Sequence, residues 1–258
     1  MTTKNVDDDE EEEIFVSGGD AYYGAGKDYT GYIYRIDMDN SANYNAVSIS
    51  PPGGFTIDGK RIGLGHSLRV ADLDGDGALE ICLPGSLENR LLDVSYWTAY
   101  LLVLELDQPC NYTYTIIPGY EEEEGKNVYP YIGLDVGELD SAMPNNGEEI
   151  ALCVNQEQHS DYHLYIFKYP FTNDVTPPIC EYSLQEADSI YDIKIGNIGN
   201  ICNGNEINEI VVCGSAPPLK GRSLRKYFEV FGFISPGLQS CWQVFGEKGS
   251  IGDLAIVK

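Results

Sequence analysis

The sequence predicts an all-β protein, a β-propeller of four four-stranded blades. Glu-Ile followed by a short apolar run occurs four times, at Glu13, Glu80, Glu149 and Glu209, roughly every 60–70 residues. Each occurrence is followed by a segment of alternating apolar and polar residues, rich in β-branched and aromatic side chains. No segment shows a sustained helical period. Repeated β units without helices are typical of small sheets arranged radially, as in a propeller.

Each unit is predicted to contain four strands in the same order. A leading strand precedes the Glu-Ile strand, and an alternating strand and a shorter last strand follow it. The leading strands are 67–70, 133–136 and 192–195, the alternating strands 30–37, 98–105, 161–168 and 225–232, and the last strands 43–50, 111–117, 179–184 and 240–245. Pro and Gly cluster between these segments and mark loops. The predicted blades are 5–50 with 250–258, 64–117, 131–184 and 189–245, in a single domain over residues 1–258.

The first unit lacks an obvious leading strand, because the chain runs from Asn5 directly into an acidic stretch. At the other end, residues 252–257 match the pattern of the leading strand 192–195. We therefore predict that the C-terminal strand completes the first blade and closes the ring, which removes free sheet edges. Two alternatives remain open. The terminal strand completes the blade of another copy, giving self-association by strand exchange, or the chain is part of a larger propeller.

A calcium loop is predicted between Val70 and Ile81, where carboxylates alternate with small residues ahead of an apolar strand. Ca²⁺ takes about six to eight oxygen ligands at about 2.3–2.6 Å, and Gly75 and Gly77 permit the necessary turns. In an EF-hand the last ligand would fall at Leu83, which cannot coordinate a metal, and helices would flank the loop. The sequence therefore favours a strand-flanked calcium loop. Its predicted ligands are Asp72, Asp74, Asp76, the carbonyl of Ala78, and Glu80.

The other three units carry weaker versions of this loop. A run of like charge such as the first acidic stretch is usually a disordered tail, but its gap-free alignment with the calcium loop favours a metal loop here. The third loop needs an insertion to align. The fourth has less charge and is expected to bind weakly, or to replace the ion with hydrogen bonds. The candidate ligands are Asn5, Asp7, Asp9 and Glu13 in loop one, Glu138, Asp140, Asn145 and Glu149 in loop three, and Asn197, Asn205 and Glu209 in loop four.

The formal net charge of −25 excludes several partners. Nucleic acids and anionic membranes both require a basic surface. No apolar run approaches the roughly 20 residues that span a bilayer, and residues 1–5 lack the apolar core of a signal peptide. The negative charge is either a solvated surface or is partly neutralised by bound cations.

The cysteines repeat with the units. Cys82, Cys153 and Cys213 follow the Glu-Ile pairs, and Cys110, Cys180 and Cys241 each follow one of them by roughly 28 residues. The two members of such a pair would lie two strands apart, at about 10 Å, whereas a disulfide needs Cα atoms about 4.4–6.8 Å apart. Free buried thiols are therefore favoured over disulfides within a unit, unless a neighbouring blade supplies a partner. Cys202 is predicted to be unpaired in either case.

The acidic loop and the apolar strand that follows it resemble the FG-GAP repeat family, also called VCBS or integrin α-like. The match is closest over 70–85, good over 5–18, and looser over 138–154 and 197–214. This resemblance implies a calcium-bound propeller of the kind found on cell-surface receptors, lectins and secreted proteins, with ligands meeting the loops of one face. Its members are commonly larger than four blades.

We expect a calcium-stabilised, non-enzymatic binding or adhesion propeller, or a structural subunit of an extracellular assembly. The alternative is a carbohydrate-active propeller, a lectin or a polysaccharide lyase. No catalytic set is evident, and none of His66, His159 and His163 stands in a zinc-like pattern. Such loops suit the calcium concentration outside cells, and the sequon that begins at Asn111 has meaning only in a secreted eukaryotic protein. Exposed aromatic side chains that could stack on sugars are Tyr22, Tyr23, Tyr129 and Tyr131.

Overall fold

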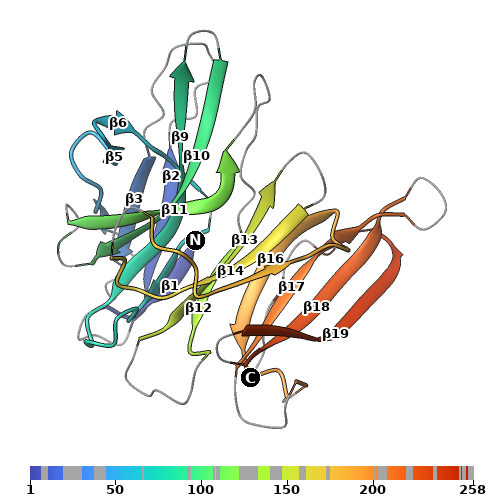
Figure 1. Cartoon of the computed structure of the whole chain (residues 1–258). Helices are drawn as coiled ribbons and strands as arrows, with labels where there is room; N and C mark the ends of the chain where they lie inside the picture. Colours follow the sequence, from blue (N-terminus) through green and yellow to red (C-terminus); the bar gives the residue numbers. More distant parts are fainter. Residues whose placement is uncertain are drawn as a thin grey trace. The chain divides into compact units, whose positions relative to one another are not determined.

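The structure is a computed structural model of the whole chain (Figure 1). It describes residues 1–6, 11–19, 31–37, 45–65, 67–91, 94–106, 108, 111–121, 133–139, 147–156, 161–172, 175–199, 201–202, 208–218, 223–234, 237–249, 251 and 254. Within these ranges every regular element is a β-strand, so the predicted all-β class is confirmed.

The chain forms two compact units. The first contains Met1–Asp72, Gly77–Val128 and Phe171–Thr176, and the second contains Leu73–Asp76, Tyr129–Pro170 and Pro177–Lys258. Each unit carries the strands of two of the repeats found in the sequence, and Leu73–Asp76 of the second repeat is grouped with the second unit. The grouping of the sheets as blades of one domain stays a prediction.

The first unit contains two larger antiparallel sheets and a short hairpin. The first sheet has the order β1-β2-β3-β4, and in the second β11, β10 and β9 follow one another while β7 and β8 both pair with β9. The strands of the first sheet are β1 Thr2–Lys4, β2 Glu13–Gly19, β3 Gly31–Asp37 and β4 Asn45–Ser48. Those of the second are β7 Gly63–Leu64, β8 Arg69–Ala71, β9 Glu80–Leu91, β10 Val94–Glu105 and β11 Tyr112–Glu121. The hairpin joins β5 Thr56–Ile57 to β6 Lys60–Arg61 through Asp58 and Gly59, whose φ angles of 51° and 74° suit a tight two-residue turn.

The leading strand of the first sheet differs from the prediction. Residues Thr2–Lys4 form β1, which pairs with β2 in the register Thr2 to Phe15 and Lys4 to Glu13. The place predicted for the C-terminal strand is thus taken by the N-terminal residues, and that prediction is wrong. The physical reason is that closing a short local loop costs less chain entropy than joining segments from opposite ends of the sequence. Residues 252, 253 and 255–258 lie outside the described part.

The second unit contains two four-stranded antiparallel sheets whose strands follow one another in chain order. The first comprises β12 Gly133–Gly137, β13 Glu149–Gln156, β14 Asp161–Phe167 and β15 Cys180–Ser183, and the second β16 Ser189–Gly196, β17 Glu209–Ala216, β18 Arg225–Ile234 and β19 Gly237–Lys248. The predicted order of leading, Glu-Ile, alternating and last strand is therefore confirmed in both sheets.

The two sheets of the second unit approach each other closely between β12 and β16. A Cβ atom added to Gly137 would lie 2.6 Å from Cγ2 of Ile195, and one added to Gly133 would lie 3.1 Å from Cγ2 of Ile193. Asp135 Oδ2 also accepts a hydrogen bond from the Ile195 N–H at 2.8 Å. The small residues of β12 thus allow the branched side chains of β16 to pack directly on its backbone.

Each unit has its own apolar core. In the first unit Phe15, Ile33 and Phe55 are fully buried together with side chains of β9 and β10. In the second unit Tyr227 and Phe231 of β18 are fully buried among side chains of β13, β14, β16 and β17. Burying one such side chain contributes about 1.5–3 kcal/mol, so these clusters hold the sheets together.

Three of the cysteines that follow the Glu-Ile pairs agree with the prediction. Cys82, Cys153 and Cys213 are buried free thiols, as expected. Burial raises the pKa of the Cys82 and Cys153 thiols, so both stay protonated.

Cys202 and Cys241 depart from the prediction, because they form a disulfide with the two Cα atoms 5.2 Å apart, so Cys241 is not the free thiol that was expected. The prediction that Cys202 is unpaired is wrong, because the loop after β16 reaches β19 beside Gly232 of β18. A Cβ atom on Gly232 would lie 2.7 Å from Cβ of Cys202 and 3.4 Å from Sγ of Cys241. Of the remaining cysteines, Cys180 is a free thiol and Cys110 lies outside the described residues.

Candidate metal centre

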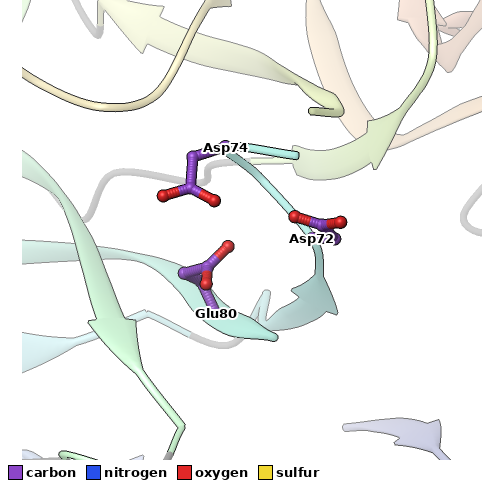
Figure 2. A group of neighbouring side chains, drawn as sticks. All are labelled: Asp72, Asp74 and Glu80. Atoms are coloured by element: carbon purple, nitrogen blue, oxygen red, sulfur yellow. The ribbon is translucent and has the colours of Figure 1, made fainter. Parts of the chain in front are cut away.

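The acidic loop between β8 and β9 brings three of its predicted ligands together. Carboxylate oxygens of Asp72, Asp74 and Glu80 all lie within 4.8 Å of one another, and Figure 2 shows the three side chains around a common point. Glu80 is fully buried, whereas Asp72 and Asp74 are half-buried. Asp76, also a predicted ligand, is exposed and not part of this group.

The backbone of this loop is shaped by its glycines. Gly75 and Gly77 have φ angles of 80° and 91°, a region that side-chain-bearing residues rarely adopt. The Gly77 N–H donates to Asp72 Oδ2 at 3.1 Å, and the Asp76 N–H donates to Asp74 Oδ1 at 3.1 Å. The loop therefore holds its two inward carboxylates by its own backbone. Ala78, whose carbonyl was the remaining predicted ligand, is exposed in the same loop.

The chemistry of this donor set fits a hard cation. Three carboxylates supply only oxygen, which suits Ca²⁺, whereas zinc sites in proteins more often use nitrogen and sulfur. Glu105 lies directly opposite Glu80 in the pairing of β9 with β10, and like charges in that position are destabilising. The loop thus concentrates negative charge in a way that a bound divalent cation would relieve.

The glutamate that ends each loop is buried in all four repeats. The exposed fractions are 1% for Glu13, 0% for Glu80, 3% for Glu149 and 3% for Glu209. Carboxylates are almost never fully buried unless they are paired, so each one requires a specific partner. These partners differ from loop to loop.

In three loops the buried glutamate accepts a hydrogen bond from the backbone at the start of its own loop. The donors are the Val6 N–H to Glu13 Oε2 at 2.8 Å, the Leu139 N–H to Glu149 Oε2 at 2.8 Å, and the Ile198 N–H to Glu209 Oε2 at 3.1 Å. Each donor is the residue directly after the first predicted ligand of its loop. The glutamate therefore closes the loop, a structural role that the sequence reasoning missed. The signal that would have found it is the apolar residue in the second position of every loop.

In the third loop a lysine neutralises the glutamate. Lys168, directly after β14, places Nζ 2.6 Å from Glu149 Oε1 and 2.6 Å from the carbonyl oxygen of Gly147. This ammonium group stands beside the carboxylate where the calcium interpretation expects an ion. Of the other candidates in this loop, Glu138 is described, and its backbone carbonyl oxygen accepts a hydrogen bond from Asn208 Nδ2 at 2.8 Å. Asp140 and Asn145 lie outside the described residues.

In the fourth loop backbone groups surround the glutamate. Glu209 Oε1 accepts from the Ile201 N–H at 2.9 Å, in addition to the bond from Ile198. Asn197 Oδ1 accepts from the Gly199 N–H at 3.0 Å, so this side chain organises its own turn. Asn205 lies outside the described residues. Both oxygens of Glu209 are thus satisfied by neutral donors.

In the first loop only two candidates are described. Asn5 is exposed, Glu13 is buried, and Asp7 and Asp9 lie outside the described residues. Six other residues singled out in the sequence also lie outside the described residues: His66, His159, Tyr22, Tyr23, Tyr129 and Tyr131.

His163 is a half-buried residue of β14. Its Nδ1 lies 2.8 Å from Glu181 Oε1, and its ring stacks on Tyr165 at a centroid distance of 5.7 Å. These contacts agree with a packing role on the strand.

The fold and the acidic loop define an all-β protein built from antiparallel sheets with a clustered carboxylate site. Comparison with protein-family models, with curated proteins and with solved structures found no match for the chain. Among the described residues, no helix is long and apolar enough to cross a membrane.

Proposed function

We propose that this chain is a calcium-stabilised, non-enzymatic binding or structural module. The observation that carries the proposal is the convergence of Asp72, Asp74 and Glu80 within one short loop between two strands. Two carboxylate charges 4.8 Å apart repel by about 1 kcal/mol in bulk water and by about 3.5 kcal/mol at an effective dielectric constant of about 20. A bound Ca²⁺ converts this repulsion into attraction, and so the ion stabilises the strands at both ends of the loop.

The proposed calcium sites form a graded series. Loop two, which contains Asp72, Asp74 and Glu80, is the principal site. Loop one, with the candidate ligands Asn5, Asp7, Asp9 and Glu13, is the second site. In loop three the Lys168 ammonium balances the charge of the glutamate, and in loop four backbone N–H groups donate hydrogen bonds to both oxygens of the glutamate. Both of these loops therefore have less need of an ion.

The sheets are proposed to be blades of a propeller of the FG-GAP kind, because the same strand order and the same buried glutamate recur in each. An extracellular or cell-surface location is proposed, and the Cys202–Cys241 disulfide supports it because such bonds persist in oxidising compartments.

Calcium titration tests the proposal. At a calcium concentration about 100 times the dissociation constant, the protein should gain about 2.7 kcal/mol of stability, or about 5–10 °C in melting temperature. Asp74→Asn should weaken calcium binding at least about tenfold, because it removes one charge from the ligand set. Asp58→Asn is the matched control, since Asp58 is exposed in the β5–β6 turn and Asn tolerates its positive φ. Equal melting temperatures with calcium and with chelator would refute the proposal.

A further inference from the structure

A polar cavity of about 460 Å³ lies in the second unit, and none of its described lining residues belongs to an acidic loop. It is bordered by β15 and the turn after it, and by β18 and β19. Its lining contains hydroxyl, amide and carboxylate side chains, among them Tyr182, Gln185, Glu186, Glu229, Ser240 and Gln243, and no Lys, Arg or His among the residues that the structure describes. The cavity therefore carries net negative charge on an already acidic protein.

Glu229 is the buried anion of this cavity. It is 3% exposed and accepts hydrogen bonds from the hydroxyls of Tyr227 and Ser240 and from Gln243 Nε2, the last at 3.2 Å. Burial raises the pKa of the Tyr227 phenol, and the adjacent Glu229 charge raises it further, so Tyr227 stays a neutral donor. A carboxylate offers about four acceptor positions, and three of them are used by these groups.

The charge of Glu229 has no cationic partner in the described part of the chain. Ion pairs seen there include Arg35 with Asp37, His163 with Glu181, Lys168 with Glu149 and Lys194 with Asp192, and none of these contains Glu229. Arg225, on the same strand as Glu229, lies over the Phe245 ring at 4.4 Å from its centroid. Buried charges in proteins are usually paired with a counter-charge. Glu229 thus differs from Glu149, whose charge is balanced by a lysine.

Tyr182 adds an aromatic wall next to this charge. Burial raises the pKa of its phenol, the Glu229 charge acts in the same direction, and a hydrogen bond with Ser240 acts against it. The tyrosine ring is therefore neutral at physiological pH, and a neutral ring can receive a cation on its face. An anion would instead meet the carboxylates of Glu186 and Glu229, and an apolar ligand would leave the polar lining unsatisfied.

We propose that this cavity binds an organic cation, a primary ammonium or guanidinium group, with Glu229 as its counter-charge and Tyr182 as its aromatic contact. The group belongs either to a small free amine or to a lysine or arginine side chain of a partner protein. The proposal deepens the binding role proposed above, on which it rests, by naming the ligand class. Its residues all belong to the second unit, and the calcium loop plays no part in it.

Matched probes of one size test the charge preference. Binding of n-butylamine, n-butanol and butyrate is measured by calorimetry and by chemical-shift mapping on the unmodified protein. We expect butylamine to bind at least about tenfold more tightly than butanol, because only the ammonium compensates the buried carboxylate. A lysine-containing tripeptide with blocked ends distinguishes a small free amine from a partner's side chain as the natural ligand. A site for protein side chains binds the tripeptide at least as tightly as butylamine, and a site for small amines binds it more weakly.

Variants identify the residue that carries the preference. Glu229→Gln keeps the shape and should weaken butylamine binding at least about tenfold. Glu186→Gln, at an exposed position, should weaken it by less than about threefold because water screens that charge. Gln239→Ala, exposed on β19 and not part of the lining, is the control and should bind as the parent does.

Equal affinity for the amine and the alcohol, or binding of a neutral sugar such as methyl glucoside in place of the amine, overturns the proposal. This comparison uses the unmodified protein, so it decides the matter even where Glu229→Gln does not fold. Each titration is run with calcium and with chelator. Calcium stabilisation without amine binding would refute the cation site alone, and amine binding without calcium stabilisation would refute the calcium proposal alone.

Discussion

Replacing Lys168 by methionine should destabilise the second unit by removing the cation that balances a buried carboxylate. Nζ of Lys168 is 2.6 Å from Glu149 Oε1, and the two side chains are 20% and 4% exposed. Removing one partner of a buried ion pair typically costs about 3–5 kcal/mol. We expect the lower end, about 3 kcal/mol, because the lysine reaches solvent and Glu149 keeps its bond from the Leu139 N–H.

The assay is urea unfolding followed by circular dichroism, with the melting temperature as a second readout. A loss of about 3 kcal/mol corresponds to about 6–12 °C in a chain of this size. The double variant Lys168→Met with Glu149→Gln should recover at least about 2 kcal/mol relative to the sum of the single changes, because the uncompensated charge is then gone.

Lys194→Met provides the matched control. Lys194 Nζ lies 3.2 Å from Asp192 Oδ1, but Asp192 also accepts backbone hydrogen bonds from Ile193 and Leu254. Replacing Lys194 should therefore lower the free energy of unfolding by less than about 1 kcal/mol. If Lys168→Met costs no more than Lys194→Met, or if the double variant shows no coupling, then Lys168 does not neutralise Glu149.

Two further predictions concern the packing of the second unit. Cys202→Ser should lower the free energy of unfolding by about 4 kcal/mol, because its disulfide closes a loop with a sequence separation of 39. The measurement is urea unfolding under oxidising conditions, and an unchanged midpoint would mean that the bond does not constrain the chain. Gly137→Ala should cost about 1–3 kcal/mol by overpacking, because its new methyl group would lie 2.6 Å from a side-chain atom of β16. Gly18→Ala in β2 is its control, since no atom lies within 4 Å of the added Cβ, and equal melting temperatures for the two variants would contradict the close approach.

The sheets could be predicted because their signals are local. Alternation over β10, β14 and β18 and the Glu-Ile at the start of β9 identify strands and their order without knowledge of distant contacts. β1 escaped notice because Thr2–Lys4 is too short to show alternation. Only its pairing with β2 reveals it as a strand.

The site was predictable in part for the same reason. Asp72 and Asp74 are close in sequence to Glu80, and the glycines between them signal the turn. Lys168 could not be assigned, because its contact with Glu149 depends on the pairing of β13 with β14 across a loop.

The hydrogen bond from the second residue of a loop to its buried glutamate has a consequence for how such repeats can change over time. Because the backbone itself anchors the glutamate in three of the loops, no particular side chain is needed at the other loop positions to keep the following strand in register. Those positions are free to gain or lose acidic residues by single substitutions. A repeat of this design can therefore acquire or abandon an ion while its sheet persists, and a single chain can carry both kinds of loop side by side.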